Sequence, residues 1–353
     1  MNKDVKGNGV DPMDVIDEYG ADTLRFFLTT NSAPGMDLRY IPEKLEASWN
    51  FINKIWNSAR FVLMNIDESM KYEDLTFDNL NLCDKWILNR LNEVIREVDI
   101  NMDKFEFVNV GTELYKFIWD DFCSWYIELT KVHLNSENEV EKQASLNTLV
   151  YVLNAIVKML HPFMPFVTEE IFQAIPHLEE SICIASWPEV NEDFNDEQIN
   201  DQFTYLIDIV KGIREIRSQY TIKNAIEVAY IIDTKDSQLE SLMDQCLPYI
   251  KKLCNAICSG YNLKATGEVA NITIKGGNSL LIELGDYIDK DAEKEKLQAQ
   301  LSKLEGEIKR CQNMLANEKF VSKAPKEKVE LERKKLADYQ SKYDAVKEKL
   351  DTM

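Results

Sequence analysis

The chain has 353 residues, of which 45% are hydrophobic and 29% are charged, and its formal net charge is −20. This length suits two or three domains with cores of their own, and no apolar run reaches the length of a membrane span or of a signal-peptide core. The acidic balance argues at first against a nucleic-acid partner. The seven cysteines are scattered without a C-x-x-C pair, so we expect reduced thiols in a cytoplasmic protein, with neither a disulfide framework nor a metal site.

The first segment, Gly7–Leu28, is typical of two short helices separated by a glycine. Asp11 can accept hydrogen bonds from the free amides of a first turn, and Pro12 suits the first helical position. Gly20 offers a left-handed exit from the first helix. We assign residues 1–40 as a connector.

Residues 41–195 show apolar residues at helical spacing, which predicts an antiparallel helical bundle. The predicted helices are Pro42–Ile66, Asp84–Ile100, Phe107–Val132, Leu146–Leu160 and Pro165–Ile175. On the first of them, the predicted apolar face comprises Leu45, Trp49, Ile52, Ile55, Trp56, Ala59 and Leu63.

Residues 196–288 have a different pattern, which predicts a small α+β unit. Helical stretches at Asp201–Ser218 and Ser237–Cys254 enclose a β-branched, alternating stretch at Ile226–Asp233. A pair of strands then follows within Asn271–Leu284, around the turn Gly276-Gly277-Asn278.

The last segment, residues 289–353, carries a heptad repeat that is interrupted near Pro325. It predicts an antiparallel coiled-coil hairpin, with a homodimeric coiled coil as the alternative. Its 16 Lys and Arg exceed its 14 Asp and Glu, so the tail carries +2 and the remainder of the chain −22. Overall the sequence predicts a mainly α protein, in which a helical bundle precedes a small α+β unit and a coiled-coil hairpin.

Several of these stretches resemble valyl-tRNA synthetases, which are class I aminoacyl-tRNA synthetases. "GNGVDPMDVIDEYGADTLRFFL" is similar to the segment that follows the family's K-M-S-K-S loop. "LYKFIWDDFCSWYIELTK", "MLHPFMPFVTEEIFQ" and "ASWPE" resemble its class Ia anticodon-binding helical domain, and "NEKFVSKAPKEKVELERKKLADYQ" its C-terminal coiled coil. The resemblance covers nearly the whole chain, in order, from Gly7 onward.

The resemblance implies that the full-length parent uses ATP and Mg²⁺ to attach valine to tRNA(Val). The family's catalytic domain with its H-I-G-H motif, and its editing domain, would precede Gly7. In register with K-M-S-K-S this chain reads Met1-Asn2-Lys3-Asp4-Val5, without the serines. We therefore expect no catalytic residues, cofactors or metal in this segment, and expect it to be inactive alone. Its partners would be tRNA(Val) and the missing N-terminal domains, with no membrane involvement, and it would be a monomer.

The resemblance also implies two groups of RNA-binding residues, because RNA sequence is read in unstacked loops by aromatic stacking and by side chains that reach base edges. On the helix Pro42–Ile66 the candidates for the anticodon are Lys44, Asn50, Phe51, Lys54, Asn57 and Arg60. In the coiled coil, the candidates for the tRNA backbone are Arg310, Lys323, Lys326, Lys328, Arg333, Lys334 and Lys335. An ordinary solvated face is the alternative for both groups, and a core position is the alternative for Phe51.

No catalytic motif accompanies these candidates. His133, His161 and His177 are far apart in the sequence, and we expect His161, beside Pro162, to be a structural histidine. The pair Asp120-Asp121 is interpreted as polar positions of a buried helix. A free-standing, degenerate synthetase tail that binds RNA or protein partners is the alternative function.

Overall fold

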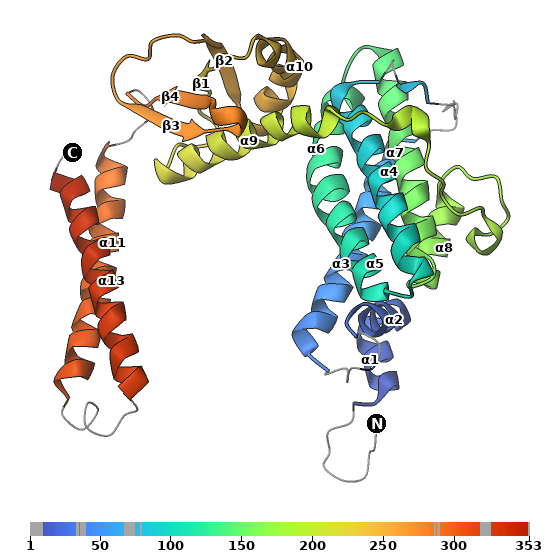
Figure 1. Cartoon of the computed structure of the whole chain (residues 1–353), viewed down its shortest axis with the longest axis horizontal. Helices are drawn as coiled ribbons and strands as arrows, with labels where there is room; N and C mark the ends of the chain where they lie inside the picture. Colours follow the sequence, from blue (N-terminus) through green and yellow to red (C-terminus); the bar gives the residue numbers. More distant parts are fainter. Residues whose placement is uncertain are drawn as a thin grey trace. The chain divides into compact units, whose positions relative to one another are not determined.

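The computed structural model describes residues 10–32, 35, 40–66, 75–77, 80–285, 287, 290–317 and 326–351. Its contacts divide the chain into two compact units, shown with the element labels in Figure 1. One, here called the bundle unit, comprises residues 1–207 and 238–253, and the other, the sheet–hairpin unit, comprises residues 208–237 and 254–353. Helix α9 (Ile199–Gln219) contributes residues to both.

Helices α1 (Pro12–Tyr19) and α2 (Ala21–Thr30) confirm the prediction for the first segment. The Asp11 side chain accepts a hydrogen bond of 3.0 Å from the Met13 amide and so caps α1. Gly20 ends α1 with its amide donating to the Ile16 carbonyl at 2.8 Å. Its φ of +86° and ψ of 157° place it in an extended region open to glycine, not in the left-handed helical region that we expected.

In the structure of the bundle, each of the five stretches predicted to be helical is helical. Its elements are α3 (Pro42–Met64), α4 (Leu82–Asp103), α5 (Phe107–Lys116), η2 (Phe117–Tyr126), α6 (Ile127–Leu134), α7 (Glu139–Leu160) and α8 (Pro165–Ala174). The stretch predicted as a single helix at Phe107–Val132 contains a π-helical segment, η2, in its middle. A π-helix has more residues per turn than an α-helix, so it shifts the apolar face in a way that a 3.6-residue period does not predict.

The predicted apolar face of α3 is wrong at two positions. Trp49 and Trp56 are 42% and 41% exposed, whereas Phe51 is fully buried. The small residues Ser48 and Ser58 are buried instead, and the Ser58 hydroxyl lies 3.0 Å from the Cys123 sulfur of η2. These small side chains let α3 approach η2 closely, and the two bulky indoles at the margin of the predicted face turn outward.

A buried carboxylate joins three elements of the bundle. Asp84 near the start of α4 accepts hydrogen bonds from the Tyr126 hydroxyl of η2 at 2.7 Å and from the Ser145 hydroxyl of α7 at 2.8 Å. The side-chain amide of Asn81, the residue that caps α4, donates to it at 2.5 Å. Burial raises the pKa of Asp84 to about 6, and these three hydrogen bonds limit the rise.

The sheet–hairpin unit contains the described strands β1 (Val228–Asp233), β2 (Ala256–Tyr261), β3 (Val269–Thr273) and β4 (Ser279–Glu283). Helix α10 (Ser237–Cys254) connects β1 with β2 along the chain, but its residues 238–253 belong to the bundle unit. The strand order is β2-β1-β4-β3, with β1 and β2 parallel and the other neighbours antiparallel. The predicted strands correspond to β1, β3 and β4. Strand β2 was not predicted, because "AICSGY" lacks an alternating apolar pattern.

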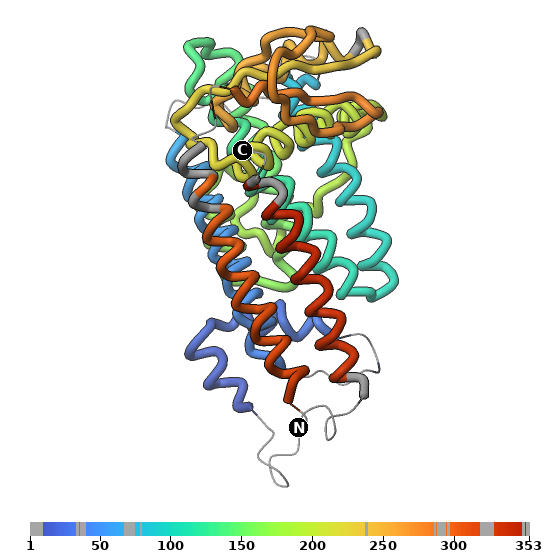
Figure 2. The backbone as a smooth tube through the Cα atoms, turned by 90° about the vertical axis from the view of Figure 1, so that its left-hand side faces the viewer, coloured from blue at the N-terminus to red at the C-terminus, as the bar shows by residue number. Residues whose placement is uncertain are grey.

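The C-terminal helices α11 (Lys290–Ala316) and α13 (Lys326–Asp351) run side by side in both Figure 1 and Figure 2. They are antiparallel, since the Tyr343 hydroxyl donates to Glu305 at 2.9 Å while Cys311 contacts Glu332 nearer the other end. The heptad residues are buried or half-buried within the single chain: Leu297, Leu301, Leu304, Ile308, Cys311, Leu315, Val329, Leu336, Tyr339, Tyr343, Val346 and Leu350. This confirms the predicted hairpin.

Among the described helices, none combines the length and the apolar character that crossing a membrane would require.

Candidate nucleic-acid interface

One side of α3 presents aromatic rings and polar donors together. We call the surface formed by Trp49, Asn50, Asn53, Trp56, Asn57 and Arg60 the α3 surface. At 3.6 residues per turn, these positions fall within an arc of about 120° around the helix axis. Asn53 is half-buried and the other five are exposed.

The donors of the α3 surface are available for a ligand. Among the described residues, no partner is seen for the side-chain amides of Asn50, Asn53 and Asn57 or for the guanidinium of Arg60. The rings of Trp49 and Trp56 stack on no other described ring, although each exposes about two fifths of its surface. Large exposed aromatic rings beside unpaired amide and guanidinium groups are the side chains that bind unstacked bases.

A second aromatic group lies beside α3, on the neighbouring helices. The rings of Tyr115 and Trp119 are nearly parallel, at 8°, with centroids 5.5 Å apart. The ammonium group of Lys54 lies 5.5 Å from the centre of the Trp119 ring, so this lysine is held by a cation–π contact. Lys131 lies in the same way 5.4 Å from the ring of Phe61.

The structure brings only three of the six predicted anticodon residues together, and Lys54 is held at the ring of Trp119. Asn50, Asn57 and Arg60 lie together on the α3 surface, as described above. Lys44 is exposed but precedes Arg60 by about 24 Å along the helix, at 1.5 Å per residue. It lines a cleft of about 310 Å³ together with Tyr115 and Lys116.

The prediction of Phe51 as an RNA-binding residue is wrong. Its side chain is 0% exposed, and its ring packs 5.3 Å from Phe26 and 4.9 Å from Tyr115, measured between centroids. A ring enclosed in this way cannot stack on a base without opening the bundle. The aromatic component of the surface comes from Trp49 and Trp56, which the helical periodicity assigned to the core.

Comparison with known proteins gives the family context. Residues 84–232 match the model of the anticodon-binding domain of tRNA ligases, and residues 289–353 match that of the valyl tRNA synthetase tRNA binding arm. The valine–tRNA ligases of Staphylococcus aureus strains JH9 and Newman are each 48% identical over 351 residues, covering 98% of this chain and 40% of those proteins. The chain therefore carries an anticodon-binding domain of tRNA ligases and a valyl tRNA synthetase tRNA binding arm, and it is similar to valine–tRNA ligases along 98% of its length.

The chain spans 40% of the length of these relatives and corresponds to their C-terminal part. A LeuRS of Agrobacterium radiobacter K84, in its ternary complex with tRNA and LeuAMS, is structurally similar at a TM-score of 0.42 and 19% identity. That match covers 54% of this chain and 22% of the LeuRS chain.

The anticodon-binding match begins at Asp84, so α3 precedes the matched range, although the chain-length alignment with the valine–tRNA ligases extends over 351 residues. The tRNA binding arm match coincides with α11 and α13, the hairpin. Both predicted RNA-binding domains are therefore present in the chain.

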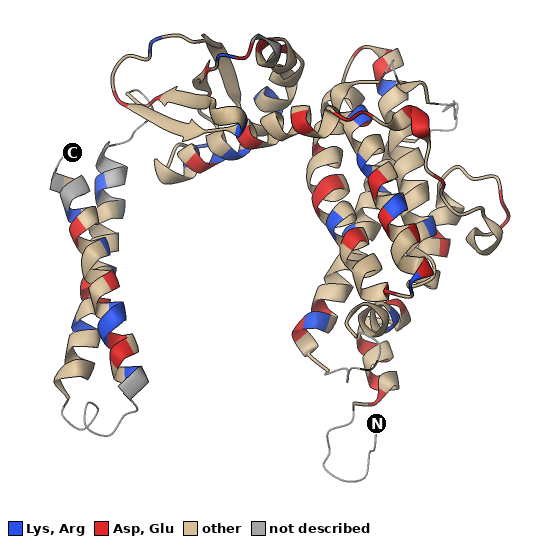
Figure 3. Cartoon of the chain, viewed as in Figure 1, with Lys and Arg blue, Asp and Glu red and all other residues tan. Residues whose placement is uncertain are grey.

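The predicted RNA-binding cations of the hairpin differ in whether they already form an ion pair within the protein. Lys328, Arg333 and Lys334 are exposed and have no acidic partner among the described residues. Arg310 pairs instead with Glu307 at 2.8 Å, and Lys335 with Glu332 at 3.3 Å. Figure 3 shows both signs of charge distributed along the two helices.

Two of the predicted hairpin cations, Lys323 and the side chain of Lys326, lie outside the described residues. Lys328, Arg333 and Lys334 are the best placed of the predicted cations to meet phosphate, because no described ion pair has to break first.

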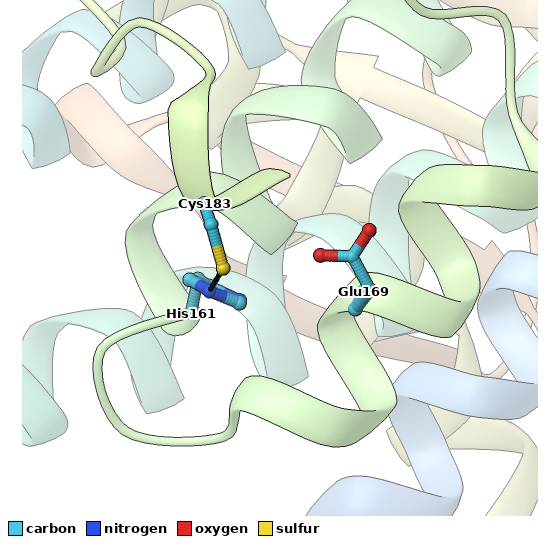
Figure 4. Close-up of side chains that lie close together, drawn as sticks. All are labelled: His161, Glu169 and Cys183. Atoms are coloured by element: carbon cyan, nitrogen blue, oxygen red, sulfur yellow. Dashed lines mark hydrogen bonds between the residues drawn. The ribbon is translucent and has the colours of Figure 1, made fainter. Parts of the chain in front are cut away.

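The histidines and the aspartate pair mostly take structural roles. His133 lies 2.7 Å from the Tyr249 hydroxyl, and His177 lies 2.7 Å from the Ile175 carbonyl. Asp121 accepts a hydrogen bond from Arg90 at 3.1 Å, whereas Asp120 is exposed. His161 differs, because the fold brings it close to Cys183 and Glu169 (Figure 4).

Proposed function

We propose that this chain is the tRNA(Val)-binding part of a valine–tRNA ligase. In this proposal the full-length protein uses ATP and Mg²⁺ to attach valine to tRNA(Val), and acts as a monomer in the cytoplasm. The chain described here recognises the anticodon through the bundle unit and holds the tRNA backbone through the hairpin. The α3 surface carries the proposal, because it places two exposed indoles beside amide and guanidinium donors that lack a described protein partner.

The chemistry of the α3 surface suits the bases of a single-stranded loop. Stacking on an aromatic ring contributes about 1–3 kcal/mol per base and tolerates any base, since every base has a π face. Asn57 and Arg60 supply the discrimination, because amide and guanidinium groups form paired hydrogen bonds with base edges. We therefore assign affinity to Trp49 and Trp56 and specificity to Asn57 and Arg60.

The experiment compares a tRNA(Val) transcript with transcripts that differ only in the anticodon, using fluorescence anisotropy at fixed salt. Wild-type protein should prefer the correct anticodon by about 1–3 kcal/mol for each base whose paired hydrogen bonds cannot form. Arg60→Ala and Asn57→Ala should erase most of this preference and retain general affinity. Trp56→Ala should weaken binding to all the transcripts by a similar factor.

Arg96→Ala is the matched control. Like Arg60→Ala, it removes one guanidinium from the bundle unit. Arg96 lies on α4, however, and its guanidinium already pairs with Glu192 at 3.3 Å. This variant should keep the anticodon preference. Equal affinity for all anticodon variants, unchanged by Arg60→Ala, would contradict the assignment and favour a general RNA- or protein-interaction module.

A further inference from the structure

A histidine, a cysteine and a glutamate from three separate elements converge on one point of the bundle unit (Figure 4). His161 follows the last residue of α7, Glu169 lies on α8, and Cys183 lies in the short helical turn η3 (Ile182–Ile184). One potential ligand atom from each of the three lies within 4.8 Å of the other two.

The imidazole of His161 is held in the tautomer that a metal needs. Its Nδ1 lies 2.8 Å from the hydroxyl of Thr168, which is fully buried and lies 2.7 Å from the Met164 carbonyl. The single hydroxyl proton is donated to that carbonyl, so Thr168 accepts from Nδ1–H. The lone pair of His161 is therefore on Nε2, which faces the Cys183 sulfur.

The carboxylate of Glu169 is oriented in the same way. It accepts hydrogen bonds from the Gln173 amide at 2.8 Å and from the Ser181 hydroxyl at 2.9 Å. Ser181 also accepts from the Cys183 amide at 3.2 Å, so one side chain positions both the carboxylate and the turn that carries the thiol. Such outer contacts are typical of the residues that support metal ligands.

The spacing fits a tetrahedral zinc ion. With a Zn–S bond of about 2.3 Å and a Zn–N bond of about 2.0–2.1 Å, the two ligand atoms of a tetrahedral site lie about 3.5 Å apart. The Cys183 sulfur lies 3.4 Å from Nε2 of His161. A carboxylate oxygen of Glu169 lies within 4.8 Å of both of these atoms, so a shift of at most about 1.3 Å brings it to the distance of about 3.5 Å that a tetrahedral site requires. Cys183 is exposed, so solvent can reach the site.

We propose that His161, Glu169 and Cys183 form a zinc site that ties η3 to the ends of α7 and α8. A thiolate and an imidazole select zinc over magnesium or calcium, and three protein ligands leave a fourth position for water. In the free protein the thiol donates its proton to Nε2. Zinc replaces this proton, which passes to solvent, so one proton is released for each ion bound.

The test is metal binding to the complete chain, reduced with a phosphine that does not bind metal. One equivalent of Co²⁺ should produce a near-ultraviolet thiolate-to-cobalt band together with the visible bands of tetrahedral cobalt. Cys183→Ala should abolish the near-ultraviolet band, whereas Cys258→Ala, which alters another cysteine that is not fully buried, should preserve it. Competition with a chromophoric chelator gives the Zn²⁺ affinity.

The remaining variants separate ligands from supporting residues. His161→Gln should lower the Zn²⁺ affinity at least about tenfold, and Thr168→Val should lower it about 10–100-fold while keeping the cobalt–thiolate band. His177→Gln is the control histidine and should change neither. Three outcomes would each overturn the proposed zinc site. They are the absence of stoichiometric metal binding, a thiolate band that survives Cys183→Ala, and an unchanged Zn²⁺ affinity in His161→Gln. None of these outcomes bears on tRNA binding.

Discussion

At the scale of single residues, Asp84 shows what a buried polar group costs this fold. Its carboxylate is enclosed where α4, η2 and α7 meet, and burial raises its pKa from 3.8 to about 6. Between these two values the folded protein binds more protons than the unfolded chain, so the contribution of Asp84 to stability falls as the pH rises through this window. Above pH 6 the full penalty of a buried charge is present, and hydrogen bonds offset it only in part.

Asp84→Asn should remove this pH dependence, because asparagine does not titrate. Between about pH 4 and pH 7 the stability of the variant relative to wild type should increase by roughly 2 kcal/mol, which is most of the free energy that a pKa shift of about two units represents. If the asparagine amide forms weaker hydrogen bonds than the carboxylate, the variant loses the same stability at each pH, so the difference between pH values is unaffected. The measurement is urea unfolding followed by tryptophan fluorescence, which reports on the bundle unit because all six tryptophans lie there.

Asp103→Asn is the control, since it removes a carboxylate from the exposed end of the same helix. It should show little of this pH-dependent difference. If the relative stability of Asp84→Asn stayed constant over the window, the carboxylate of Asp84 would not be the titrating group.

At the scale of elements, the contact between α2 and α5 depends on a residue without a side chain. A Cβ atom added to Gly111 on α5 would lie 2.6 Å from the Cβ of Thr30 at the end of α2. The branched Thr30 side chain has little freedom to withdraw, because its hydroxyl donates to the Phe26 carbonyl at 2.6 Å.

Gly111→Ala should therefore destabilise the bundle unit by about 1–3 kcal/mol, despite the better helix propensity of alanine. Gly306→Ala in α11 is the matched control, since a Cβ there meets no other atom within 4 Å. It should stabilise the hairpin by about 0.5–1 kcal/mol. Unfolding of the Gly111→Ala variant is followed by tryptophan fluorescence, and unfolding of the Gly306→Ala variant is followed by far-ultraviolet circular dichroism. Equal effects of the two changes would mean that α2 moves away from α5 at little cost.

Local patterns explain which elements and residues could be predicted from the sequence. The hairpin was predictable because its heptads lie within two contiguous segments, and the donors Asn57 and Arg60 because helical spacing placed them outside the apolar stripe. Exposure of Trp49 and Trp56 was not predictable, because the helical period does not reveal that the buried face of α3 includes Ser58, which meets Cys123, 65 residues away. For the same reason the approach of Cys183 to His161 required the fold of α7, α8 and η3.

At the scale of the whole molecule, a chain of net charge −20 binds RNA only where it presents local cations or specific contacts. The proposal assigns these two means of binding to different units. The α3 surface offers neutral amides, indoles and one guanidinium, which suits base recognition. The hairpin offers Lys328, Arg333 and Lys334, which suit phosphate and carry no sequence information.

This division predicts different responses to salt. The combined change Lys328→Ala, Arg333→Ala and Lys334→Ala should weaken binding to every tRNA by the same factor and keep the anticodon preference. The slope of log affinity against log salt should fall by about 0.7–0.9 for each phosphate that the protein no longer neutralises. Arg60→Ala should instead reduce the anticodon preference, whose size should change little with salt. Anisotropy titrations between about 50 and 200 mM salt measure both quantities.

The control for this prediction is Lys303→Ala, Lys342→Ala and Lys347→Ala, which removes the same charge from the part of the hairpin farther from its connecting loop. Lys342 already pairs with Asp338 at 2.7 Å, so this change removes a cation that is partly neutralised within the protein. If the loop-proximal lysines and arginine contact phosphate, the control should leave most of the salt slope intact. If both triple changes flatten the slope equally, the hairpin attracts RNA only through its overall charge, and no particular part of it is a contact surface.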